Sequence, residues 1–271
     1  MGLFFNYDKP GPGVEKDAPR KKGAPLYFEL LGRNFSKLMF ANMLYFAVSL
    51  PVFAIYFIII SYFSGIAMPD AAGTMASLQI NFIITLMIMI LWGVGPVSCG
   101  YAYILRNTAR EEHTFLASDF FEKSKESFIR GVVFWFIDLV MLVSSATAVI
   151  VYNSLSESMG GIYTVLLFAS GIIILLYTIM HFYIYEFEVT FENKLLQVYK
   201  NSLIMSLSTL HMCILITLII YFCTTVILGF LNPILSLIIA FVFWISVMRF
   251  IVDFYVARTI KRKLLTENEN K

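Results

Sequence analysis

Four ionisable side chains lie inside long apolar runs of the sequence, where a charge is costly unless it is paired or hydrated. They are Asp138, His211, Arg249 and Asp253. Side chains of these types can hold protons or small ions, so we predict an intramembrane polar cluster in the cytoplasmic half, serving as an ion or substrate path.

A purely structural interpretation of the same residues stays open. Arg249 and Asp253 are four positions apart and can pair along one helix. Alternatively, Asp138 can join Arg249 across two helices and fix their packing. For His211 the competing interpretation is a hydrogen-bonded histidine of the core.

The other histidines do not stand in a spacing typical of metal or catalytic sites. His113 follows two glutamates in a polar segment, which differs from the HExxH pattern. His181 stands near two glutamates at the end of an apolar run and is interpreted as interfacial. The sequence contains no nucleophile elbow, phosphate-binding loop or dinucleotide fingerprint. We therefore expect a protein that is not an enzyme, with no cofactor and no metal.

Composition indicates which elements must position these side chains. Hydrophobic residues make up 59% of the 271 residues and charged residues 14%, against about 45–50% and about 25% in soluble domains. The net charge of +2 does not favour a nucleic-acid partner. The three cysteines lie in or beside apolar runs and are expected as small buried hydrophobes without disulfides. The lipid bilayer is the partner that this composition indicates.

Six apolar runs are long enough to cross a hydrocarbon core of about 30 Å as helices. The sequence thus predicts an all-α polytopic membrane protein with six transmembrane helices and short amphipathic interfacial helices. The predicted spans cover about 39–63, 80–105, 128–152, 162–185, 204–228 and 234–256. The predicted divisions are an N-terminal arm at 1–25, a single membrane domain at 26–257 with an amphipathic polar island at 106–130, and a C-terminal tail at 258–271.

Three residues mark places where a span should kink or break. Pro51 lies inside the first span, and Gly95 and Pro96 lie in the second. Within the island, Ser118 is placed to cap a helix that has Phe120 and Phe121 on its buried side. Amphipathic stretches are also predicted at 26–38 and 194–203.

The distribution of basic residues predicts how the protein is oriented in the cell membrane. None of the 20 Lys and Arg residues falls in the three loops at 65–79, 153–161 and 229–233. Because cytoplasmic loops carry the excess of basic residues, we place both termini in the cytoplasm.

A weak repeat is visible where two of these spans begin. Lys125-Glu126-Ser127-Phe128-Ile129 aligns with Lys200-Asn201-Ser202-Leu203-Ile204 at an offset of 75, and residues 26–38 precede the first span in the same way. Three parallel units of amphipathic helix plus hairpin would explain this, unlike the inverted repeats of many transporters. The alternative is that all basic entries into a membrane look alike.

Several short motifs together resemble the YesL-like family of bacterial integral membrane proteins. They are the opening FNYDKPGPGVEKDAPRKK, Ser49-Leu50-Pro51, Gly95-Pro96 and the island Asp119-Phe120-Phe121…Lys125…Ser127-Phe128. The family has no established biochemical function, and its members are often encoded beside genes for carbohydrate uptake and polysaccharide degradation. The resemblance implies an accessory part in sugar import and supplies no site residues.

Three functional hypotheses remain open at this point. The first is a non-enzymatic accessory or regulatory partner of a carbohydrate ABC-type uptake system, because the outer loops are too short to capture a sugar. The second is a small oligomeric transporter or channel with a polar pocket facing the cytoplasm, favoured by the breaks at Pro51 and Pro96 and by the polar cluster. The small-residue spacing of Ser144 and Ala148 fits packing within one chain as well as an oligomer. The third is a membrane-embedded sensor that signals through the island.

Overall fold

The structure, a computed structural model, describes residues 21–265, and within that range it is built from helices. Most of the predicted N-terminal arm and the last residues of the predicted tail lie outside this range. The α-helices are α1 Ala24–Arg33, α2 Phe35–Ala67, α3 Met75–Leu91, α4 Pro96–Arg110, α5 Leu116–Glu126, α6 Phe128–Met159, α7 Ile162–Thr190, α8 Leu195–Ser208, α9 Leu210–Phe230, α10 Pro233–Ile239 and α11 Ile245–Ile260. A 3₁₀ turn spans Pro69–Ala71, and π-helical turns span Ala240–Trp244 and Lys261–Leu265.

The predicted all-α polytopic architecture is confirmed, with five to six spans. Five helical segments are long and apolar enough to cross a membrane: α2, α6, α7, α9 and the run from α10 through α11. A sixth span forms if α3 and α4, which meet at a bend of 65°, are counted together. The predicted cytoplasmic placement of both termini stays a prediction.

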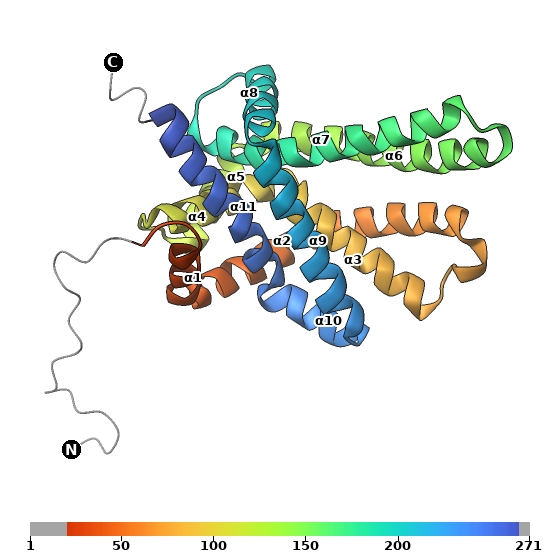
Figure 1. Cartoon of the computed structure of the whole chain (residues 1–271). Coiled ribbons are helices and arrows are strands. Elements are labelled where there is room, and N and C mark those ends of the chain that lie inside the picture. Colours follow the sequence, from red (N-terminus) through yellow and green to blue (C-terminus); the bar gives the residue numbers. More distant parts are fainter. Residues whose placement is uncertain (1–20, 266–271) are drawn as a thin grey trace, which may run out of the picture.

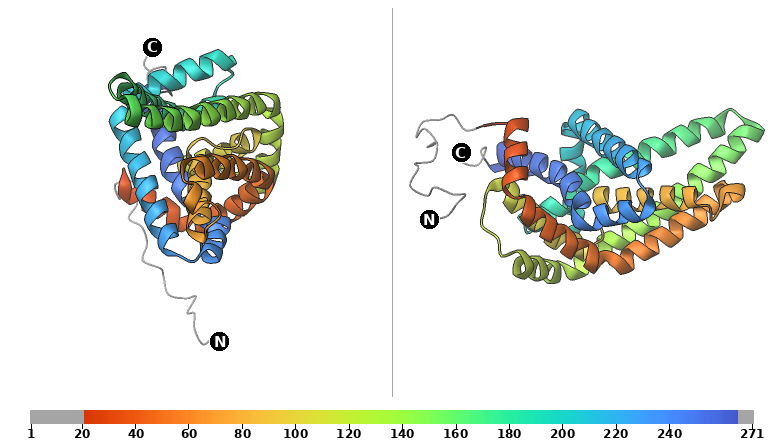
Figure 2. Two further views of the ribbon diagram at one scale, coloured as in Figure 1. Left: turned by 90° about the vertical axis from the view of Figure 1, so that its right-hand side faces the viewer. Right: turned by 90° about the horizontal axis from the view of Figure 1, so that it is seen from below.

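The long helices are arranged as hairpins with polar short helices at one end. The α2–α3 and α6–α7 hairpins project to the same side, away from α1 and from the end of α11 (Figures 1 and 2). We name the end that carries α1, α5 and α8 the basal end. Arg33 of α1 contacts Glu111 after α4 there at 2.6 Å, and Lys263 donates to Ser208 of α8 at 3.0 Å. The Glu111 carboxylate raises the pKa of Arg33.

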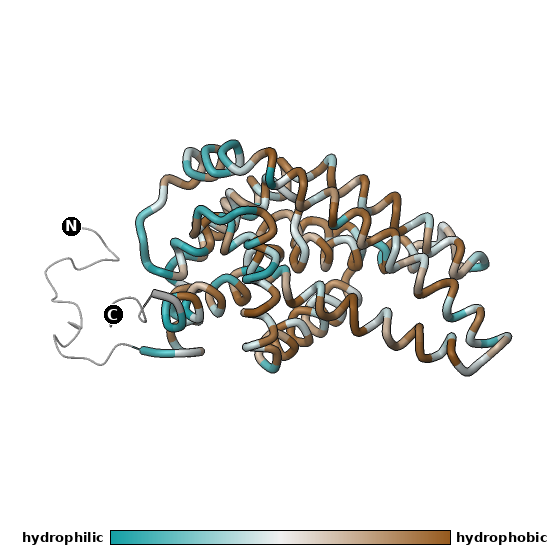
Figure 3. Tube along the Cα trace, turned by 90° about the horizontal axis from the view of Figure 1, so that it is seen from above, coloured by the Kyte–Doolittle hydropathy of each residue, from teal (hydrophilic) through white to brown (hydrophobic). Residues whose placement is uncertain are grey.

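The outer surface of the long helices is apolar, as a bilayer requires. Only 17% of the most apolar window of α6 and 22% of that of α7 is buried inside the protein. Hydrophilic positions concentrate at the basal end, while the long hairpins are dominated by hydrophobic positions (Figure 3). Exposing these apolar faces to water would cost about 25 cal/mol for each Å² of apolar surface. The structure therefore describes a multi-pass membrane protein.

Pro51, where a kink or a break was expected, does not interrupt the helix of the first span. The α2 helix is continuous from Phe35 to Ala67 with Pro51 inside it. Proline removes one helical hydrogen bond, which a transmembrane helix can satisfy by local adjustment or by neighbouring side chains.

Three junctions between a short basal helix and a long helix have the same backbone geometry. The single linking residues are Asn34 (φ −106°, ψ 16°), Ser127 (φ −93°, ψ 17°) and Thr209 (φ −129°, ψ 22°). All three lie near the bridge region of backbone space, which interrupts a helix for one residue. This supports three parallel units, but it corrects the alignment: Ser127 corresponds to Thr209, not to Ser202.

The island helix begins earlier than expected and buries less. Helix α5 starts at Leu116, and Ser118 lies within its first turn instead of capping it. The Asp119 carboxylate reaches back and accepts from the backbone N–H of Phe115, the residue before the helix, at 2.9 Å, while no side chain caps the first turn in the way predicted for Ser118. Phe120 is buried, whereas Phe121 is exposed. Phe120 and Phe121 therefore lie on different sides of the helix, one buried and one exposed, and not together on one buried side.

Asn42 of α2 supports the π-helical turn that interrupts the last span. Its amide nitrogen donates to the carbonyls of Ala240 at 2.8 Å and Phe241 at 2.6 Å, and its Oδ1 accepts from the Ser246 N–H at 2.6 Å. A π turn leaves main-chain groups without their usual partners inside the helix, and Asn42 supplies them.

We expect Asn42→Ala to lower the free energy of unfolding by about 2–4 kcal/mol, because it strands buried main-chain groups at about 1–3 kcal/mol each. Denaturation in mixed micelles measures this loss. Asn153→Ala is the matched control, because Asn153 is exposed and its side chain donates only to Glu157. A loss for Asn42→Ala as small as that of the control would contradict the assigned role.

Candidate functional site

The second span is interrupted in the middle of the protein by four residues without helical structure. Helix α3 ends at Leu91 and α4 begins at Pro96. Gly93 (φ 87°) and Gly95 (φ 65°) adopt left-handed conformations that favour glycine, and Pro96 lacks the N–H that a first-turn residue would leave unpaired. The break expected at Gly95 and Pro96 is therefore present. We refer to residues 92–95 as the break.

A broken helix inside a membrane must satisfy its free main-chain groups with protein partners. Arg249 of α11 donates to the carbonyls of Ile90 at 2.9 Å and Leu91 at 3.3 Å. Its positive charge thus lies at the negative end of the α3 dipole. The carbonyls released at the end of α3 are in this way tied to the last span.

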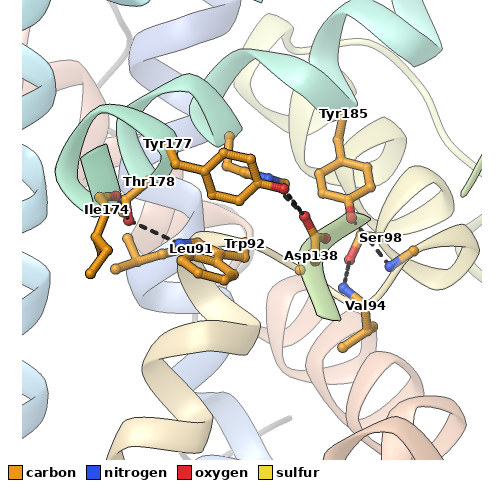
Figure 4. A network of polar contacts seen from close by, with 12 residues as sticks. Leu91, Trp92, Val94, Ser98, Asp138, Ile174, Tyr177, Thr178 and Tyr185 are labelled. Carbon is orange, nitrogen blue, oxygen red and sulfur yellow. Dashed lines mark hydrogen bonds and ion pairs between the residues drawn. The ribbon is translucent and has the colours of Figure 1, made fainter. Parts of the chain in front are cut away.

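The N–H groups on the other side of the break are bound by hydroxyl groups. The Val94 N–H donates to the Ser98 hydroxyl at 2.7 Å, and the Gly95 N–H donates to the Tyr185 hydroxyl at 3.2 Å. The Trp92 indole donates to the Thr178 hydroxyl at 2.9 Å (Figure 4). Helix α7 therefore holds both edges of the break, through Thr178 and Tyr185.

Asp138 of α6 contacts the same helix. Its Oδ1 accepts a hydrogen bond from the Tyr177 hydroxyl at 2.6 Å and lies 2.9 Å from His181 Nε2. The side chains of Asp138 and His181 are completely buried. Figure 4 shows Tyr177 and Tyr185 reaching from α7 toward Asp138 and the break.

The four residues predicted to form one cluster are separated into three places. Asp138 pairs with His181 on α7, whereas Arg249 and Asp253 pair with each other along α11 at 3.3 Å. His211 is exposed in the first turn of α9. Thr209 interrupts the helix just before it, and this sets α9 in a register that turns His211 outward. His211 is thus neither a core histidine nor a member of the cluster.

His181 is the residue that the sequence interpretation missed. It was expected at the interface, but it lies fully buried beside Asp138. A signal was present, because Tyr177, His181 and Tyr185 recur every four residues and so share one face of a helix. Three polar side chains on one face of an apolar helix indicate a face turned toward other protein groups.

The beginning of the predicted polar island is also buried. Arg106 donates to the Val189 carbonyl at 2.8 Å and to the Thr190 hydroxyl at 2.9 Å, at the end of α7. Arg130 contacts Glu188 at 2.9 Å and donates to the Asn193 carbonyl. Both arginines secure the basal end of α7; Arg106 is buried, whereas Arg130, at the end of the island, is partly exposed. The polar surface of the island starts only after α4.

A cavity of about 270 Å³ lies away from all of these polar groups, between α2, α3 and α10. Gln79 is the only polar side chain among its lining residues Phe53, Phe57, Met75, Leu78, Gln79, Phe82, Pro233 and Leu237. In the described part of the chain, no group of three or more His, Cys, Asp or Glu residues could hold a metal ion. The polar groups around the break are hydrogen-bond donors and acceptors on α3, α4, α6, α7 and α11.

The break and Asp138 lie in a segment that matches a known family model, whereas their partners on α7 and α11 lie outside it. Residues 75–148 match the family model DUF624, described as a protein of unknown function. The matched segment runs from the start of α3 into α6 and includes the whole break and Asp138. No curated protein and no solved structure matches the chain.

Proposed function

We propose that this protein is a non-enzymatic accessory or regulatory partner of a carbohydrate ABC-type uptake system in the cell membrane. The carbohydrate part of the proposal comes from the YesL-like resemblance. The part that concerns partner contacts is supported by the polar interior. Buried Arg249, Asp253 and Asp138 make their contacts with other groups of the same chain, which favours a scaffold over a permeation path.

The observation that carries the proposal is the surface of the basal helices. Helices α5 and α8 are not among the candidate spans, yet Leu196 on α8 is 81% exposed, and Phe121 on α5 is 51% exposed. Lysines 123, 125 and 200 lie on or beside these faces. Exposed large apolar side chains outside the spans are typical of surfaces that bind another protein or a membrane surface.

The opposite end of the molecule offers little surface for a sugar. The connections there are Met68–Thr74 between α2 and α3, Gly160–Gly161 between α6 and α7, and Leu231–Asn232 between α9 and α10. Sugar capture needs a concave site with several converging polar groups. The proposed contact with the uptake system therefore lies at the basal end or within the bilayer.

Affinity purification from native membranes after brief crosslinking tests the proposal. We expect permease or ATPase subunits of a sugar transporter to co-purify at near-stoichiometric yield, and Leu196→Ser to reduce that yield at least tenfold. Phe230→Ser is the matched control, because Phe230 is 89% exposed at the other end. Recovery of the protein alone, as a defined oligomer, would contradict the proposal.

A second candidate function is a small oligomeric transporter or channel, favoured by the break beside the buried Asp138. The test measures the flux of solute or ions that the purified protein allows across the membrane of proteoliposomes. If Asp138→Asn leaves the protein folded but abolishes this flux, transport is the function. If the variant leaves the flux unchanged or only destabilises the fold, the network serves structure.

A further inference from the structure

The Asp138–His181 pair differs from the other buried ion pair of the described structure in lacking a permanent cation. Asp253 has Arg249, which stays charged at any physiological pH. Asp138 has a histidine instead, whose charge depends on whether it binds a proton. With a neutral imidazole the buried pair carries one negative charge, and with one added proton it carries none.

The pair also has free positions at which that proton can reside. Among the described residues, neither Asp138 Oδ2 nor His181 Nδ1 has a hydrogen-bond partner, and the 2.9 Å contact to Nε2 lies outside hydrogen-bond geometry. Both atoms are basic when unprotonated. Three atoms of this pair, Asp138 Oδ2 and both ring nitrogens of His181, are thus buried without a hydrogen-bond partner within the described range, against one, Asp253 Oδ1, on the Arg249–Asp253 pair. Buried polar atoms normally have a partner, so this difference needs an explanation.

The other titratable groups around the carboxylate do not supply a charge that would replace the proton. They are tyrosines: Tyr177 and Tyr185 from α7, Tyr56 from α2 and Tyr199 from α8. Burial, and then the nearby Asp138 carboxylate, raise the pKa of the Tyr199 hydroxyl on α8. These hydroxyls stay neutral and can donate hydrogen bonds, but they do not neutralise the carboxylate.

The pair is mechanically connected to the break. Tyr177 and His181 bind Asp138, while Thr178 and Tyr185 on the same helix bind Trp92 and the Gly95 N–H. The ring of Trp92 also lies stacked against His181, with centroids 6.1 Å apart. A change in how Asp138 holds α7 is therefore transmitted directly to both edges of the break.

We propose that Asp138 and His181 form a buried binding site for a single proton. While this proton is bound, α7 stays packed against the break in the second span. With the proton bound, the pair is neutral and holds α7 against α6. When the proton leaves to water, the remaining buried negative charge is destabilising in a medium of low polarity and loosens α7 from the break. The inference does not depend on the proposed sugar-transport partner.

The first test detects the proton without altering the site. The chain has three histidines, and both His113 and His211 are exposed. The variant His113→Gln/His211→Gln leaves His181 as the single histidine, so its ¹⁵N resonances can be followed by solid-state NMR in proteoliposomes across pH. We expect the His181 resonances to show the gain or loss of one proton as the pH is changed. Asp138→Asn should shift the midpoint of this change by at least one pH unit. No transition at any pH where the protein stays folded, or one that Asp138→Asn leaves in place, would overturn the proton site.

The second test measures the link to the break in the full-length protein. We expect amide hydrogen exchange at residues 92–98, corrected for its intrinsic pH dependence, to accelerate at least tenfold as His181 loses its proton. In His181→Gln this pH dependence should vanish, whereas His211→Gln should retain it. If the exchange rate at residues 92–98 does not change when His181 loses its proton, the proton site does not control the break, and that part of the proposal is overturned.

Discussion

Arg249→Met should lower the free energy of unfolding by about 3–5 kcal/mol, the range for removing one partner of a buried ion pair. The substitution leaves Asp253 fully buried without its cation and removes the donor for the Ile90 and Leu91 carbonyls. The second consequence acts directly at the end of α3, so the break should become the least stable part of the membrane domain. Denaturation in mixed micelles measures the loss.

Two further variants separate the charge from the hydrogen bonds. Arg249→Met/Asp253→Asn removes the unpaired charge and should recover part of the loss, while the carbonyls remain without a donor. Arg249→Lys keeps the charge but not the planar arrangement of donors, so it should fall between the wild type and Arg249→Met. If the double variant is as unstable as Arg249→Met, the ion pair contributes little and the carbonyl contacts dominate.

Gly131→Ala should have an effect of comparable size, by a steric mechanism. Helix α6 crosses the break at this residue, and a Cβ at Gly131 would lie 2.5 Å from the Pro96 nitrogen and 2.6 Å from its Cα. Because these are main-chain atoms at the start of α4, they cannot move aside as a flexible side chain would. We expect a loss of about 3 kcal/mol, the upper end of the cost of overpacking a close-packed interior.

Gly171→Ala on α7 is the matched control for Gly131→Ala. Both glycines lie inside long helices, but a Cβ at Gly171 meets nothing within 4 Å. Alanine is the better helix former by about 1 kcal/mol, so the control should be neutral or slightly stabilising. A similar thermal stability of the two variants would show that α6 does not pack on the break as closely as the structure indicates.

The two substitutions act on different contacts of one feature, which makes their combination informative. Arg249 donates hydrogen bonds to the end of α3, and the missing side chain of Gly131 leaves room for the start of α4. Residues that share a structural element commonly couple, so the double variant should lose less than the sum of the two single losses. Fully additive losses would indicate that the two sides of the break open independently.

Much of the architecture follows from the sequence because helix length in a membrane is a local property. The apolar runs predict the spans, since each span must satisfy its own hydrogen bonds and match the same hydrocarbon thickness. The break at Gly95 and Pro96 is local in the same sense, because Gly95 tolerates a positive φ and Pro96 cannot continue a helix. Pro51 shows the limit of this reasoning, because a proline can also be accommodated inside a continuous helix.

The partners of the buried charges could not be predicted in the same way. The position of Asp138 in its run indicates its depth, but its partner depends on how α6 and α7 rotate about their axes when they pack. That rotation brings His181 to Asp138, and the interruption at Thr209 turns His211 outward. Arg106 belongs to a polar stretch of sequence, yet it is buried because the end of α7 packs over it.

The sequence by itself therefore determined that the chain crosses a membrane with six apolar helical runs, and where one of them must break. The tertiary structure alone decided that Arg249 closes the end of α3, and that Asp138 belongs with His181 and not with Arg249 or His211. The physical reason is that apolar length and backbone freedom are properties of neighbouring residues. The pairing of buried charges is a property of side chains far apart in the chain, which only packing brings together.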